Sequence, residues 1–170
     1  VHTCLAAICL VIGPFQFIDK LRVSFPQFHR KSGRVYVALG LIAMVTAIGY
    51  LILTPMKHIY GGAPFALGLW GIAILSIYTF IAGVVHACRG EFWQHRTLMA
   101  LNFCTLMIAP LLRIWWLVLG WAFPELNQMQ VHVAVLMFVG AQVVFAAILI
   151  ADQSRSAWAS PGSRFTHTAP

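Results

Sequence analysis

The chain has 170 residues, a net charge of +7, 61% hydrophobic residues and only 9% charged residues. About a quarter of the residues of a soluble globular domain are charged, so this composition excludes a soluble globule and predicts an integral membrane protein. The basic residues lie in short segments between apolar runs and form no continuous basic face, so we expect no nucleic-acid partner.

Five apolar segments approach the length of roughly 20 residues that a helix needs to cross the hydrocarbon core of a bilayer. We expect membrane-spanning helices at about 2–19, 35–54, 65–88, 97–122 and 130–151. Together they predict one all-α domain, 1–151, which is a polytopic transmembrane helical bundle. A polar C-terminal tail, 152–170, follows it. Four spans with a peripheral first segment are the alternative.

A basic, proline-broken turn is predicted between the first two spans, at 25–36. In the expected topology, nine Lys and Arg residues lie on the side of the membrane that contains this turn, and only Lys57 lies on the other side. Short loops rich in Lys and Arg stay in the cytoplasm, so we predict the N-terminus outside and the C-terminus inside. The nine residues are Lys20, Arg22, Arg30, Lys31, Arg34, Arg89, Arg96, Arg155 and Arg164.

These basic residues have two further interpretations besides topology. They could hold anionic lipid headgroups, each Lys or Arg near the surface contributing about 1 kcal/mol. They could also dock an acidic partner subunit.

The chain has seven histidines, of which His167 lies in the tail and the others lie near the ends of predicted spans. A b-type haem between helices needs two imidazoles on facing helices at one depth, and His86 and His132 are the best placed for this role. The alternative is that histidines at the interface are simply solvated by water and headgroups. We expect His2, His58 and His132 near the outer face, and His29, His86 and His95 near the inner face.

Arg113 lies about nine residues from the outer end of the fourth predicted span, roughly 14 Å deep at 1.5 Å per residue. An arginine at the centre of a membrane helix costs on the order of 3 kcal/mol, so it usually finds a partner. The candidates are Gln142 on the fifth span, a carbonyl freed by Pro110, a lipid or cofactor anion, or another subunit. Haem propionates or a quinone oxygen would suit its planar guanidinium.

Several short motifs resemble a family of predicted bacterial membrane proteins that is catalogued only as a domain of unknown function. The resemblance covers about 2–122 and implies a multispan protein of the bacterial inner membrane, with no activity attached. Where the family has His-Arg-Arg-Trp-Met, this chain has His95-Arg96-Thr97-Leu98-Met99. The motifs are Gly13-Pro14-Phe15-Gln16-Phe17, His29-Arg30, Gly33-Arg34-Val35-Tyr36, His95-Arg96 and Leu112-Arg113.

Two functional hypotheses follow. The first is an accessory or scaffold subunit of a larger membrane complex, or a homo-oligomer, that docks lipids or partner helices. The second is a haem b protein that transfers electrons from a quinone-like donor, because the layout distantly resembles the b-type cytochromes, which implies haem held by two axial histidines. No hydrolase or phosphate-loop motif is present, so we assign no enzyme class. Beyond haem iron we expect no metal.

Overall fold

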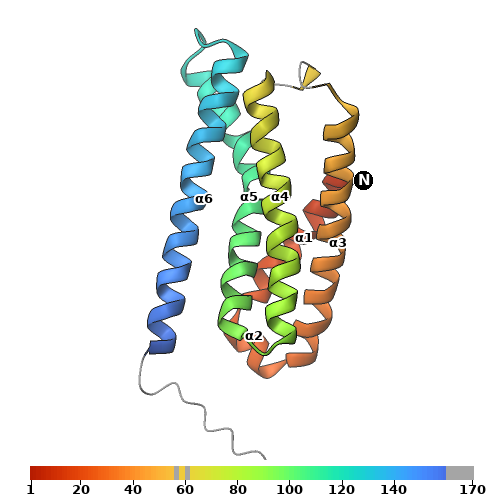
Figure 1. Cartoon of the computed structure of the whole chain (residues 1–170). Helices are drawn as coiled ribbons and strands as arrows, with labels where there is room; N and C mark the ends of the chain where they lie inside the picture. Colours follow the sequence, from red (N-terminus) through yellow and green to blue (C-terminus); the bar gives the residue numbers. More distant parts are fainter. Residues whose placement is uncertain (56–57, 60–61, 160–170) are drawn as a thin grey trace, which may run out of the picture.

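The computed structural model describes residues 1–55, 58–59 and 62–159, so Lys57, Arg164 and His167 lie outside the described residues. Within these ranges the chain forms helices and no strand. Figure 1 shows the long helices side by side, with α2 and the α4–α5 turn at one end, called here the α2 end. The helices are α1 (His2–Gln16), α2 (Asp19–Ser24), α3 (Pro26–Leu53), α4 (Gly62–Cys88), α5 (Phe92–Ala122) and α6 (Gln128–Ala159).

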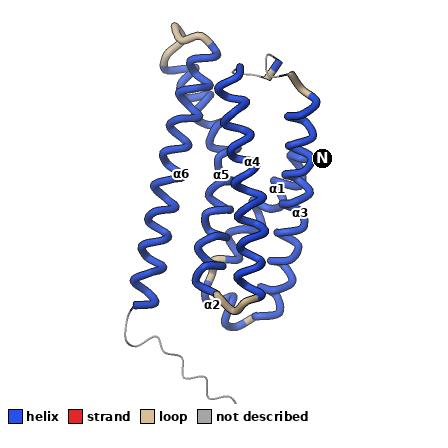
Figure 2. Tube along the Cα trace, in the orientation of Figure 1, coloured by secondary structure: helices blue, strands red, loops and turns tan. Residues whose placement is uncertain are grey.

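The prediction of an all-helical membrane protein is confirmed, and the tube in Figure 2 is helical along nearly all of its described length. Three helices, α3, α4 and α5, are long and apolar enough to cross a membrane. The 15 residues of α1 extend about 22 Å, which is less than the hydrocarbon core of about 30 Å. In α6 the described apolar stretch is Gln130–Ala146. Five spans and the orientation of the termini therefore stay predictions.

The predicted turn at 25–36 is wrong for all but its first residue, because α3 begins at Pro26. Proline suits the first position of a helix, where its missing N–H would have no helical partner and its fixed φ is already helical. The basic residues that follow Pro26 therefore form the first turns of α3 and continue into its apolar part. They lie at the α2 end of the bundle.

A tight turn at Gly90 joins α4 to α5. Gly90 has a φ of +76°, a left-handed conformation that glycine adopts without a steric cost. Its N–H donates to the Ala87 carbonyl at 3.2 Å, and the Glu91 N–H donates to the His86 carbonyl at 2.9 Å. The turn reverses the chain, so that α4 and α5 pack against each other.

His2 Nδ1 donates a 2.8 Å hydrogen bond to the Ala43 carbonyl. This contact shows that the first turn of α1 lies beside the middle of α3. From there α1 runs along α3 to the α2 end, and the Cys9 thiol contacts the Tyr36 carbonyl at 3.5 Å. The sequence predicts His2 near the outer face, whereas it lies ten residues, about 15 Å, before the end of α3. At the other end of the chain, α6 continues to Ala159, eight residues past the predicted span.

Candidate functional site

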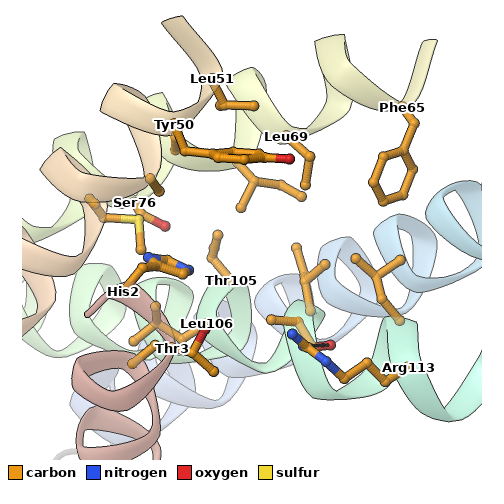
Figure 3. Close-up of a pocket in the computed structure, with 18 of the residues that line it drawn as sticks. His2, Thr3, Tyr50, Leu51, Phe65, Leu69, Ser76, Thr105, Leu106 and Arg113 are labelled. Atoms are coloured by element: carbon orange, nitrogen blue, oxygen red, sulfur yellow. Dashed lines mark hydrogen bonds between the residues drawn. The ribbon is translucent and has the colours of Figure 1, made fainter. Parts of the chain in front are cut away.

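A cavity of about 650 Å³ lies among α1, α3, α4, α5 and α6 (Figure 3). Most of its wall consists of aliphatic and aromatic side chains, as in many ligand sites, where a few polar groups fix the orientation of the ligand. The polar residues in the wall are His2, Thr3, Thr46, Tyr50, Ser76, Thr105, Arg113 and His132.

Arg113 is the charged residue in this wall. Its Nη1 donates a 2.9 Å hydrogen bond to the Ala109 carbonyl on the same helix, since helical side chains point back toward the N-terminus of their helix. Figure 3 shows the side chain extended along the cavity wall. Among the residues that the structure describes, no carboxylate forms an ion pair with Arg113.

Gln142, the predicted neighbour of Arg113, is exposed on α6 and does not line the cavity. The described hydrogen bond of Arg113 goes instead to the Ala109 carbonyl of its own helix. The carbonyl that Pro110 frees is that of Leu106, four residues before it, so the predicted bond to a freed carbonyl is not the one observed. Arg113 is exposed, and no hydrogen bond is described for its other guanidinium N–H groups.

His2 and His132 both line the cavity, but at different depths. His2 is beside the middle of α3, as its bond to Ala43 shows. The His132 ring lies 5.4 Å from Phe65 and 6.1 Å from Trp116, measured between ring centroids. Figure 3 shows His2 and Phe65 at opposite ends of the cavity, so the two imidazoles do not face each other.

Ser76 is a cavity residue that the sequence patterns do not single out. It is fully buried at 0% exposure, and its Oγ has no hydrogen-bond partner among the described residues. The nearby Thr105 hydroxyl, by contrast, donates to the Leu101 carbonyl at 2.8 Å. A serine inside the apolar run of α4 is the only signal that could have indicated this position.

The other predicted histidines lie outside the cavity. At the α2 end, His86 Nδ1 pairs with the Glu91 carboxylate, and His95 Nδ1 donates to the Gly83 carbonyl at 2.8 Å. His29 Nδ1 is buried there without a described partner. His58 is exposed in the connection between α3 and α4. Of the predicted site residues, His2, Arg113 and His132 therefore line the cavity, at different positions along it.

Residues 1–150 match the model of one protein family, described as "Predicted membrane protein (DUF2306)". The match extends beyond the region 2–122 that contains the short motifs, and it agrees with that resemblance. The description states a membrane location and no activity. Neither a curated protein nor a solved structure matches the chain.

Proposed function

The chain belongs to the DUF2306 family of predicted membrane proteins, and from this premise we propose a non-catalytic accessory role in the membrane. In this role the protein holds an amphiphilic molecule in its cavity, against Arg113. The polar groups of the cavity would fix the head of such a molecule, and the apolar wall would pack against its body.

The observation that carries this proposal is an arginine in an apolar cavity without an acidic partner among the described residues. Arg113 has five N–H donors and one described hydrogen bond, to Ala109. A central arginine costs on the order of 3 kcal/mol in a membrane helix. Oxygen atoms of a ligand that accept hydrogen bonds from the guanidinium would offset part of this cost.

The rest of the cavity suits an apolar molecule. Its volume of about 650 Å³ falls within the roughly 300–1,000 Å³ of typical ligand sites. Leu69, Ile72, Leu112 and Val135 line it with aliphatic side chains. A molecule with an oxygen-bearing head and an apolar body therefore matches both the wall and Arg113.

The haem hypothesis draws less support from this cavity. A six-coordinate b-type haem needs two imidazoles on opposite sides of one iron, and His2 and His132 line different ends of the cavity. The residues present do not fit such a haem here, so we derive no step through it. Oxidised and dithionite-reduced absorption spectra test the hypothesis directly, since a haem protein shows a Soret band and a redox-sensitive alpha band.

Thermal unfolding of the delipidated protein in detergent tests the proposed function. We expect the phospholipid fraction or the neutral isoprenoid fraction of a bacterial membrane extract to raise the Tm, because a ligand that binds only the folded state stabilises it. The rise should vanish in Arg113→Gln and persist in Arg34→Gln, a control at the α2 end. A rise of equal size in all three proteins, or no rise in any of them, contradicts the proposal.

A further inference from the structure

We propose that the α2 end of the bundle is a pH-sensitive contact, in which protonation of His29 separates α2 and the first turns of α3 from α5. This contact lies apart from the cavity and does not depend on the proposed function. Three features of this end support it: two histidines on facing helices, the positive charges around them, and the weak attachment of α2.

His29 on α3 and His95 on α5 lie at one level of the bundle. Both helices begin at the α2 end and run in the same direction (Figure 1). The hydrogen bond of 2.8 Å between Tyr36 and Asn102 joins the two helices, and each histidine lies seven residues before one member of that pair. Seven residues are about two helical turns, or about 10 Å, so the histidines lie on the same two helix faces as Tyr36 and Asn102. The two imidazoles are near enough to interact electrostatically.

Protonation of His29 would add a positive charge to a contact that is already positive. His29 Nδ1 is buried and has no hydrogen-bond partner among the described residues, so no described acceptor meets an N–H at this nitrogen. The charges that act on His29 are those of Arg22 on α2, Arg30 on α3 and His95 on α5, and each of them, when charged, repels an imidazolium. The sequence of α1 contains no Asp, Glu, Lys or Arg. The closed contact therefore suits the neutral imidazole of His29.

The other two histidines at this end have acceptors for their Nδ1 atoms. His95 Nδ1 donates to the Gly83 carbonyl of α4 at 2.8 Å. His86 Nδ1 pairs with the Glu91 carboxylate in the turn between α4 and α5, and a carboxylate favours the charged form of an imidazole. His29 is therefore the histidine of the α2 end whose protonation the described contacts oppose.

α2 is attached weakly, so this end is able to open. It consists of six residues, Asp19–Ser24, and none of them is buried. Asp19 links it to α5 through Arg96 at 3.4 Å, with side chains that are 61% and 40% exposed, and exposed ion pairs contribute little to stability. Gln16 Nε2 donates to Ser32 Oγ at 2.8 Å and ties α1 to α3. These helices therefore stay together, and we expect the contact with α5 to open.

Pulsed electron paramagnetic resonance between two spin labels tests the opening in the full chain in detergent. The labels are attached at Ser24→Cys on α2 and Phe92→Cys at the start of α5, two exposed positions, in a cysteine-free background. Between about pH 7.5 and about pH 5.5, histidine side chains titrate and carboxyl groups stay mostly ionised. We expect the ratio of the longer to the shorter distance population to rise by up to about tenfold per pH unit, because opening takes up one proton.

Four variants separate the role of His29 from that of its neighbours. His29→Gln should abolish the response to pH. Arg30→Gln should move the response to higher pH, because it removes a charge that opposes protonation of His29. Lys31→Gln is the matched control, since Lys31 is the next residue, is exposed and is not among the charges that act on His29. His86→Gln should also respond as the wild type does.

A distance distribution that does not change with pH in the wild type overturns the proposal, and so does an equal response in His29→Gln. If His29→Gln does not fold, the comparison of Arg30→Gln with Lys31→Gln decides, and equal responses of these two proteins overturn the proposal. Arg113→Gln should keep the full response to pH, since Arg113 lies in the cavity wall. Failure of this proposal therefore leaves the proposed function of the cavity intact.

Discussion

Tyr36 Oη donates a 2.8 Å hydrogen bond to Asn102 Oδ1 and so joins α3 to α5 across 66 residues of sequence. Both side chains are almost completely buried. Asn102 Nδ2 in turn donates to the Ser76 carbonyl and to Thr79 Oγ1, at 3.1 and 2.9 Å. This network holds α4 against α5 on the side of the cavity that is nearer the α2 end. It does so at Ser76, the residue whose hydroxyl has no described partner.

Removing the Tyr36 hydroxyl should destabilise the fold. Tyr36→Phe leaves Asn102 Oδ1 as a buried acceptor without its donor, and hydrogen bonds between membrane helices contribute about 0.6 kcal/mol on average, with values up to about 1.7. We therefore expect a loss of about 1 kcal/mol in the free energy of unfolding, measured by titration with sodium dodecyl sulfate in mixed micelles. Tyr78→Phe is the matched control, because Tyr78 is 60% exposed. Equal effects of the two substitutions would show that the network contributes nothing.

Gly40 should not tolerate a side chain. A Cβ at this position would overlap the ring of Phe80, which is fully buried and packs on Tyr36 at 5.5 Å between ring centroids. Overpacking of a close-packed core costs typically 1–3 kcal/mol, so Gly40→Ala should lower the Tm. Gly49→Ala on the same helix has open space around the new Cβ. A Gly40→Ala protein as stable as Gly49→Ala would contradict this packing.

Asp19 should matter little for stability, although it lies 3.0 Å from Arg22 and 3.4 Å from Arg96. Its side chain is 61% exposed, and exposed ion pairs contribute about 0–1 kcal/mol. We expect Asp19→Asn to change the free energy of unfolding by less than about 1 kcal/mol, with a smaller effect at high salt. A larger loss would mean that Asp19 is an essential link between α2 and α5.

The predicted topology can be tested by labelling with a membrane-impermeant maleimide. In a cysteine-free background, Glu125→Cys in the α5–α6 loop should react in intact cells. Ser24→Cys at the α2 end should react only after the membrane is permeabilised, because the basic residues are expected on the cytoplasmic side. The reverse pattern would invert the orientation predicted from Lys and Arg.

Features that depend on the composition of a single helix can be predicted from this sequence. Features that depend on where a helix begins and how it packs against its neighbours cannot. Arg113 is recognisable because a charge inside an apolar run is unusual wherever the run folds. The contact between His2 and Ala43 is not visible in the sequence, because depth is counted there from the ends of predicted spans, and the pairing of the start of α1 with the middle of α3 depends on helix packing. The position of Ser76 in the cavity depends on contacts between α4 and α5, which no pattern in one sequence reports.

Pro26 gives a second example. Proline after a polar segment predicts a break, although proline also favours the first position of a helix. The residues after the proline distinguish the two interpretations, and here α3 continues without interruption from Pro26 to Leu53. The membrane-protein family, by contrast, is recognisable from short motifs within about 2–122, and the family model matches 1–150.

The most direct test of the central claim, that Arg113 holds an amphiphile in the cavity, is native mass spectrometry of the protein released gently from membranes. We predict an organic adduct on the wild-type protein that Arg34→Gln retains and that is absent from Arg113→Gln. A wild-type protein without an adduct, or an adduct equally abundant on Arg113→Gln, would contradict the claim.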